Sequence, residues 1–183
     1  MGAKGKIGLI GLAVMGANLA RNLAGHGIST VVYNRSRDKT ENFLKEFGSD
    51  PNLSGVAALE ELVNSLEKPR KIILMIKAGE AVDAMMAKLV PFLEKGDILI
   101  DGGNSFFEDT RRRSREMEAL GLHFVGMGVS GGEEGALYGP SLMPGGAREA
   151  YDALAPILKA VSAKAEGEAC VDYMGPDGAG HYV

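Results

Sequence analysis

Residues Ile7–Gly16 read IGLIGLAVMG, an apolar run that contains the pattern G-x-A-x-x-G at Gly11, Ala13 and Gly16. Gly11 permits a tight turn after a strand, Ala13 keeps the backbone near a bound pyrophosphate, and Gly16 lets a following helix pack against the strand. The N-terminus of that helix offers backbone N–H groups to an anion. The segment therefore predicts a strand, a turn and a helix that bind a dinucleotide, although Ala13 replaces the glycine of the strict pattern.

Short apolar runs alternate with longer helical patterns along the rest of the chain. Runs that are apolar throughout indicate strands buried on both faces, as in a parallel sheet covered by helices. We expect strands at Lys6–Ile10, Ser29–Tyr33, Lys71–Ile76, Ile98–Ile100, His123–Val125 and Ala169–Tyr173. We expect helices at Met15–Ala24, Arg37–Phe47, Leu59–Leu66, Glu80–Leu93, Phe106–Leu120 and Arg148–Val161. The alternation predicts an α/β, Rossmann-like doubly wound fold, with a mainly parallel sheet, right-handed crossovers and helices on both faces.

The chain shows no internal repeat and no interdomain linker, so residues 1–183 are expected to form a single domain. The segment Ser105-Phe106-Phe107-Glu108 fits a capping box at the start of a helix. The segment Gly175–Val183 is rich in turn residues, and a new element is expected to begin there. We therefore expect one domain of a longer chain.

Glycine makes up 26 of the 183 residues, about 14%, against a usual share of about 7%. Collagen needs glycine at every third position, and a flexible linker lacks the 45% hydrophobic residues found here, so the glycines belong to a folded domain. A net charge of −4 argues against nucleic acid or an anionic membrane as a partner. The single Cys170 and three scattered histidines predict neither a disulfide nor a metal site. We expect a soluble, cytoplasmic protein.

The second predicted strand ends in Asn34-Arg35-Ser36. NAD sites usually carry Asp or Glu there, about 20 residues after the glycine motif, to bind the ribose 2′-hydroxyl. Here Arg35 can pair with a 2′-phosphate, and Asn34 and Ser36 can donate hydrogen bonds. A solvated basic turn before a helix would explain these three residues equally well on their own. Together with the glycine motif upstream, they predict NADP.

Two further predicted strands end in glycine-rich turns, Asp101–Ser105 and Gly126–Gly135. Ligands of open α/β sheets bind at the carboxyl ends of the strands, so both turns should line one crevice. Successive glycine N–H groups can bind an anion, Ser130 adds a hydroxyl, and Asn104 offers a donor and an acceptor to a hydroxyl-bearing substrate. For the first turn alone, a chain reversal with Asn104 capping a helix is the favoured interpretation.

Several other polar residues are weaker candidates. Glu133 and Glu134 are adjacent, so they should diverge, and a solvated or capping role is expected for both. Lys77 follows an apolar strand near the expected cofactor. His181 is expected to be structural or to orient a group beyond Val183. Four arginines are expected to cover a helix surface, namely Arg111, Arg112, Arg113 and Arg115.

Seven segments together resemble the decarboxylating 6-phosphogluconate dehydrogenases. They are GLAVMGANL (11–19), NRS (34–36), IKAG (76–79), DGGNS (101–105), GVSGGEEGA (128–136), GPSLMPGG (139–146) and GAGHYV (178–183). GVSGGEEGA with GPSLMPGG is highly specific, whereas G-x-A-x-x-G is shared with the wider β-hydroxyacid dehydrogenases. The resemblance covers the whole chain and matches the N-terminal coenzyme domain of the family. One departure is Ser36, where the family commonly has threonine; the hydroxyl is kept.

The resemblance implies which residues contact ligands. For the sugar acid they are Asn104, Ser130, Gly131 and Gly132. For NADP they are Gly11, Leu12, Ala13, Val14, Met15, Gly16, Asn34, Arg35, Ser36, Ile76, Lys77, Ala78 and Asn104.

The resemblance also implies the reaction of the parent protein, which would oxidise 6-phosphogluconate with NADP in the pentose phosphate pathway and release carbon dioxide and ribulose 5-phosphate. In the family a lysine directly after the G-H-x-V segment takes the proton from the C3 hydroxyl as hydride leaves C3. No catalytic residue is therefore expected among residues 1–183, which end at Val183. The general-acid glutamate, the all-helical domain and the homodimer contacts of the family are expected beyond it. No metal is needed, since the keto group formed accepts the electrons of decarboxylation.

Two other interpretations stay open. Another β-hydroxyacid dehydrogenase would share the first turn, but the GGEEGA and GPSLMPGG segments argue against it. The chain as given can also be a nucleotide-binding module without turnover, and we favour this for residues 1–183 alone. Such a module is expected to bind NADPH and to leave 6-phosphogluconate unoxidised.

Overall fold

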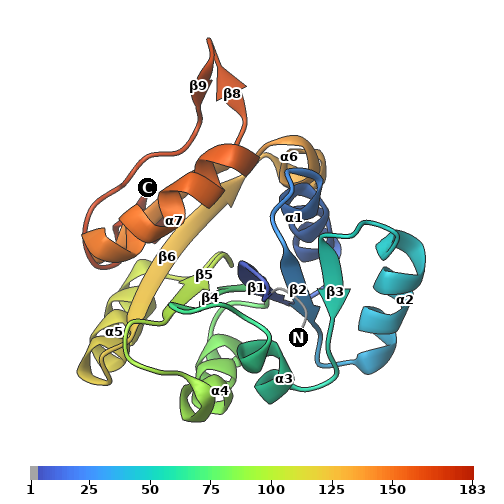
Figure 1. Ribbon diagram of the computed structural model, residues 1–183. Coiled ribbons are helices and arrows are strands. Elements are labelled where there is room, and N and C mark those ends of the chain that lie inside the picture. The colour runs from blue at the N-terminus through green and yellow to red at the C-terminus, as the bar shows by residue number, and fades with distance from the viewer. Residues whose placement is uncertain (1–3) are drawn as a thin grey trace.

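The computed structural model describes residues 4–183 and shows three layers, with a twisted sheet between two sets of helices (Figure 1). The sheet has seven strands in the order β3-β2-β1-β4-β5-β6-β7, and every neighbouring pair is parallel except β6 and β7. Its strands are β1 (Ile7–Ile10), β2 (Thr30–Tyr33), β3 (Leu53–Gly55), β4 (Lys71–Leu74), β5 (Ile98–Asp101), β6 (His123–Ser130) and β7 (Ser141–Gly146). The predicted Rossmann-like fold is confirmed.

Helices cover both faces of the sheet. They are α1 (Val14–Gly25), α2 (Arg37–Phe47), α3 (Leu59–Asn64), α4 (Glu80–Leu89), η1 (Val90–Phe92), α5 (Phe107–Ala119), α6 (Gly132–Tyr138), α7 (Arg148–Val161) and α8 (Ala179–Tyr182). One core lies under α1, α2 and α7, and the other under α3, α4 and α5. Because helices cover both faces, every residue of β1, β4 and β5 is buried.

The direction of strand succession reverses between β1 and β4. The chain leaves β1 towards β2 and β3, and then returns to place β4 on the other side of β1. Ligands of open α/β sheets bind outside the carboxyl ends of the strands at such a reversal. The site described below lies there.

The region after β5 differs from the sequence expectations. The strand expected at His123–Val125 continues to Ser130, because β7 pairs with it antiparallel from Val125↔Gly146 to Ser130↔Ser141. The segment of β7 was not predicted as a strand, since it contains Pro144 and two glycines. Residues 132–135, expected to lie in a glycine-rich turn, instead form the start of α6.

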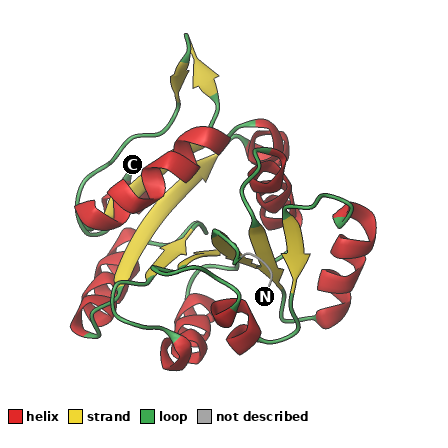
Figure 2. Cartoon of the chain, in the orientation of Figure 1, coloured by secondary structure: helices red, strands yellow, loops and turns green. Residues whose placement is uncertain are grey.

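The prediction of a strand at Ala169–Tyr173 is wrong, because only Ala169 lies in a strand. Glu166 and Gly167 both have positive φ, 52° and 89°, and this pair makes a two-residue turn between β8 (Lys164–Ala165) and β9 (Glu168–Ala169). The hairpin projects from the body of the domain (Figure 2). After it, Val171 forms only an isolated bridge to Leu142.

The expected capping box at Ser105 is also wrong. Phe106 occupies the N-cap position of α5, and no side chain caps the helix there. The Ser105 hydroxyl instead donates a hydrogen bond to the Asp101 carboxylate at 2.6 Å. Among residues 4–183, no helix is both long and apolar enough to cross a membrane.

Candidate functional site

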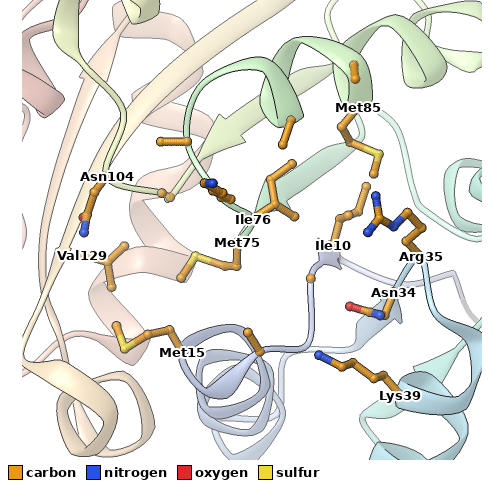
Figure 3. A pocket seen from close by; sticks show the side chains of 18 of the residues that line it. Ile10, Met15, Asn34, Arg35, Lys39, Met75, Ile76, Met85, Asn104 and Val129 are labelled. Carbon is orange, nitrogen blue, oxygen red and sulfur yellow. The ribbon is translucent and has the colours of Figure 1, made fainter.

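A cavity of about 850 Å³ lies at the carboxyl edge of the sheet, where β1 and β4 are neighbours (Figure 3). Its walls come from five places: the β1–α1 turn, the β2–α2 turn, the segment from Met75 into α4, the β5–α5 loop and the end of β6. Cavities of about 300–1,000 Å³ are typical of sites for small molecules and cofactors.

The β1–α1 turn depends on two of its glycines. Gly11 has φ 104°, and its N–H donates to the Tyr33 carbonyl at 3.0 Å. A Cβ at Gly16 would lie 1.9 Å from the Gly11 carbonyl oxygen, so no side chain fits there. Helix α1 has neither a side-chain cap nor an acidic residue in its first turn. Its first N–H groups are therefore available to an anion.

Not every predicted residue of this turn lines the cavity. Ala13 and Met15 do, together with Gly11. The Leu12 side chain is buried in the core, and the Val14 side chain is about half exposed, at 52%. Gly16 is buried against Gly11. Leu12, Val14 and Gly16 thus shape the turn, and any contact of theirs with a ligand stays a prediction.

The β2–α2 turn brings Asn34, Arg35 and Ser36 to the cavity, as expected from the sequence. The Asn34 side chain is already bonded: Oδ1 accepts from the Leu12 N–H at 3.0 Å, and Nδ2 donates to the Ser36 carbonyl at 3.2 Å. Ser36 is the N-cap residue of α2, and its hydroxyl makes no capping bond. Lys39, which sequence reasoning missed, joins them from the first turn of α2. Its signal was its place in the first turn of the helix that directly follows Asn34-Arg35-Ser36.

Helix α4 provides the facing wall. Ile76, Lys77 and Ala78 line the cavity before the helix begins, as predicted. Four residues of the helix itself line it as well, and sequence reasoning missed them: Ala81, Ala84, Met85 and Lys88. Their spacing of three and four residues places them on one face of the helix, and only the packing of α4 turns that face to the cavity.

The charge of this cavity is opposite to that of the chain. Four cationic side chains line it, and none of the described lining residues is a carboxylate; the four are Arg35, Lys39, Lys77 and Lys88. Within residues 4–183, none of the four forms an ion pair with Asp or Glu. The cavity is therefore suited to an anionic ligand, although the chain carries a net charge of −4.

The two ends of the cavity differ in chemistry. Arg35 and Lys39 lie at one end, and Asn104 and Val129 lie at the other, beyond Met75 and Ile76 (Figure 3). The second end also contains Ser130, Gly131 and Gly132. All the residues predicted to contact a sugar acid thus line the same cavity as ten of the thirteen residues predicted to bind the dinucleotide.

Helix α6 is held beside this second end by α1. Asn18 Nδ2 donates to the Glu133 carbonyl at 2.9 Å, and the buried Asn22 donates to the Ala136 carbonyl at 3.1 Å. Glu133 and Glu134 are both exposed in the first turn of α6 and do not line the cavity. They form no carboxylate pair at the site.

His181 lies behind the second end, where its Nδ1 and the Thr110 hydroxyl form a hydrogen bond of 2.7 Å. Burial lowers the pKa of the His181 imidazole; the charge of Asp101 and nearby backbone carbonyls partly oppose this, and Arg113 adds to it. A neutral imidazole is therefore favoured. Of the four arginines expected on a helix surface, Arg113 is instead completely buried.

The cavity can bind an elongated anion that extends from the Arg35 end past the N-terminus of α1. A hydroxyl-bearing group can bind at the Asn104 end. The α1 N-terminus lies between the ends, and Asn104 with Ser130 supplies polar groups for orientation. Among residues 4–183, no three His, Cys, Asp or Glu side chains lie close enough together to hold a metal ion.

Comparison with known proteins gives consistent results. Residues 6–175 match the family described as the NAD binding domain of 6-phosphogluconate dehydrogenase. The NADP(+)-dependent, decarboxylating 6-phosphogluconate dehydrogenase of Bacillus subtilis is 60% identical over 181 residues, which are 99% of this chain and 38% of that protein. The chain thus spans little more than a third of that relative.

Solved structures agree with the sequence match. Plasmodium falciparum 6-phosphogluconate dehydrogenase, described with its cofactor NADP+ and its substrate 6-phosphogluconate, superposes with a TM-score of 0.92 at 46% identity, over 97% of this chain and 38% of that one. Mycobacterium tuberculosis 3-hydroxyisobutyrate dehydrogenase superposes with a TM-score of 0.81 at 22% identity, over 98% of this chain and 57% of that one. The second likeness shows a shared fold alone.

Proposed function

The chain belongs to the family of the NAD binding domain of 6-phosphogluconate dehydrogenase, and we propose that it is the coenzyme-binding part of an NADP-dependent, decarboxylating 6-phosphogluconate dehydrogenase. One observation carries this proposal. A single cavity joins the glycine turn and a cationic end, at Arg35 and Lys39, to a polar end at Asn104 and Ser130.

The residues present fit an NADP molecule. The pyrophosphate would lie at the N-terminus of α1, where Gly11 and Gly16 bring the backbone close and no acidic side chain competes. The 2′-phosphate would lie at the cationic end, where Arg35 offers a planar pair of donors and Lys39 a point charge. The adenosine would face the side of α4 that contains Ala84 and Met85. The nicotinamide would then reach the end of the cavity that contains Asn104.

The polar end is proposed to bind the sugar acid. Bound NADP would accept a hydride from C3 of 6-phosphogluconate. Asn104 can orient a substrate hydroxyl through its amide, and Ser130 with the N–H groups of Gly131 and Gly132 can bind anionic or hydroxyl oxygens. Together these residues would hold C3 near the nicotinamide.

The proton acceptor is assigned elsewhere. The resemblance implies a lysine that follows the G-H-x-V segment. The relatives that this chain matches are more than twice as long as the chain. We propose that the protein acts as a cytoplasmic homodimer that uses 6-phosphogluconate as substrate. Residues 1–183 alone are expected to bind NADPH and to show no oxidation of 6-phosphogluconate.

Coenzyme titration tests the proposal. We expect the chain to bind NADPH at least about tenfold more tightly than NADH, because a bidentate charged contact contributes about 1.5–3 kcal/mol. Arg35→Ala should remove most of this preference. The matched control is Arg37→Ala: Arg37 is 73% exposed, pairs with Glu41 at 2.7 Å and does not line the cavity. Equal binding of NADPH and NADH by the unaltered chain would contradict the proposal.

A further inference from the structure

Arg113 of α5 is completely buried, and its guanidinium contacts two separate segments. On one side Nε and Nη2 donate to the Asp83 carboxylate at 2.7 and 3.1 Å, and Nη2 also donates to the Gly79 carbonyl at 3.0 Å. On the other side Nη1 lies 3.4 Å from the Ser105 hydroxyl and 3.6 Å from Asp101 Oδ2. The β4–α4 and β5–α5 connections are therefore joined through one side chain.

The β5–α5 connection is built on the buried Asp101 carboxylate. Oδ1 accepts from the Gly103 N–H at 3.0 Å, and Oδ2 accepts from the Ser105 hydroxyl at 2.6 Å. Asn104 lies between these two anchored residues. The position of Asn104 in the cavity thus depends on Asp101, whose Oδ2 lies 3.6 Å from Arg113 Nη1.

The β4–α4 connection carries Ile76, Lys77 and Ala78, the opposite wall of the cavity. The two connections already touch: the Gly102 N–H donates to the Leu74 carbonyl at 3.0 Å, and a Cβ at Gly103 would lie 2.9 Å from the Ile76 carbonyl oxygen. A small shift of either connection would therefore change the width of the cavity at its polar end.

A guanidinium without access to water needs its charge and its five N–H donors satisfied, and each such bond has a defined direction. The contacts of Arg113 with both connections therefore restrict how far the two can move relative to each other. A role in stability alone is the simpler interpretation. The two roles differ in which half of a bound dinucleotide is affected.

We infer that Arg113 is a positioning residue for the nicotinamide half of the coenzyme site, because it fixes the Ile76–Ala78 wall against Asn104. The inference rests on the proposed function. Arg113 itself does not line the cavity. It acts through the backbone of both connections, and it forms no hydrogen bond or ion pair with Arg35 or Lys39.

The test compares two ligands on the 183-residue chain. NADPH occupies both ends of the cavity, whereas adenosine 2′,5′-bisphosphate carries only the half expected at Arg35 and the α1 N-terminus. In Arg113→Lys the positive charge remains and the planar set of donors is lost. We expect NADPH to bind about tenfold more weakly, equivalent to one or two lost hydrogen bonds, and the bisphosphate to bind within about twofold of the unaltered chain.

Arg112→Lys is the matched control. Arg112 precedes Arg113 on the same helix and also pairs with Asp83, at 2.9 Å, but its side chain is 45% exposed and reaches neither Ser105 nor Asp101. Both ligands should bind Arg112→Lys as they bind the unaltered chain. Asp83→Asn, which weakens the α4 side of the contact, should repeat the selective loss of NADPH affinity and serves if Arg113→Lys fails to fold.

Each outcome decides between the interpretations. A parallel loss of both ligands, or no loss of either, in the folded Arg113 or Asp83 variant would overturn the positioning role. In those cases NADPH binding by the unaltered chain would leave the proposed function standing. An unaltered chain that binds neither ligand would overturn the proposed function and this inference together.

Discussion

Asn34 Oδ1 accepts a hydrogen bond from the Leu12 N–H at 3.0 Å, so the end of β2 is bonded directly to the glycine turn that follows β1. The two residues are 22 positions apart in the chain. The bond holds the proposed 2′-phosphate site in a fixed relation to the proposed pyrophosphate site. The Asn34 side chain therefore contributes to the site by holding the backbone of Leu12 in the glycine turn.

Asn34→Asp should change the coenzyme preference while keeping the bond to the Leu12 N–H, although the bond that Asn34 Nδ2 donates to the Ser36 carbonyl is lost. Aspartate keeps an acceptor for the Leu12 N–H, and it places a carboxylate where NAD sites carry one. We expect at least about a tenfold loss of NADPH affinity, because like charges in contact cost several kcal/mol, together with tighter binding of NADH. Asn42→Asp adds the same charge on the exposed face of α2, away from the cavity, and should change neither affinity. An unchanged ratio in Asn34→Asp would contradict the assignment of the 2′-phosphate to this turn.

Gly16→Ala should destabilise the domain and abolish dinucleotide binding. The new Cβ would lie 1.9 Å from the Gly11 carbonyl oxygen, so the turn must open. Overpacking of this kind typically costs about 1–3 kcal/mol, which urea unfolding can measure. Gly25→Ala in the same helix meets nothing within 4 Å and should be neutral or stabilising by up to about 1 kcal/mol. Normal NADPH binding by Gly16→Ala would show that the turn is not the binding element.

The ion pair of Asp83 with Arg113 should make the free energy of unfolding depend on pH in acid. Hydrogen bonding to Arg113, and then to Arg112, lowers the pKa of the Asp83 carboxyl from 3.8 to about 2. A carboxylate with a lowered pKa in the folded state stabilises it above the unfolded pKa, and the benefit disappears as the pH falls through the folded pKa. The difference in unfolding free energy between the unaltered chain and Asp83→Asn should therefore shrink from pH 4 to pH 2. A constant difference over that window would contradict the contact.

The buried imidazole of His181 should make the free energy of unfolding depend on pH closer to neutrality. Burial lowers the pKa of its imidazole below the ordinary 6.5, with Asp101 opposing and Arg113 reinforcing the shift. The fold therefore favours the neutral ring, and stability should fall as the pH drops below about 6.5, by at most about 1.4 kcal/mol per pH unit for one proton. His181→Gln should remove this dependence, measured by urea unfolding between pH 7.5 and 5.5. Stability that rises on acidification in the unaltered chain would be the opposite of this expectation.

The parallel half of the fold was predictable because its signals are local. Buried strands such as Ile98–Asp101 are apolar almost throughout, and Arg37–Phe47 and Arg148–Val161 follow a helical period, so both helices were predicted with the bounds observed. β7 was not predictable in this way. Its sequence SLMPGG has turn character, and it becomes a strand because the long β6 offers it an antiparallel partner.

The site was predictable where one segment carries the chemistry, and not where distant segments combine. The Gly11 turn and Arg35 were found from spacing along the chain. Lys88 was missed because only the packing of α4 brings it to the cavity of Arg35. Arg113 was misplaced for a related reason: its neighbours Arg112 and Arg115 are exposed, and the sequence does not reveal that Asp83 and Asp101 accompany it into the interior.

The cavity lining is positively charged and the whole chain is negatively charged, and this difference affects the rates of ligand binding. A dinucleotide more than one Debye length away, about 8 Å at physiological ionic strength, meets a protein of net charge −4 and is weakly repelled. Only at the cavity mouth does it meet Arg35, Lys39, Lys77 and Lys88. Added salt should therefore leave the association rate constant unchanged or slightly raise it, and should shorten the lifetime of the complex. Electrostatic attraction in this domain retains a ligand that has already arrived by diffusion.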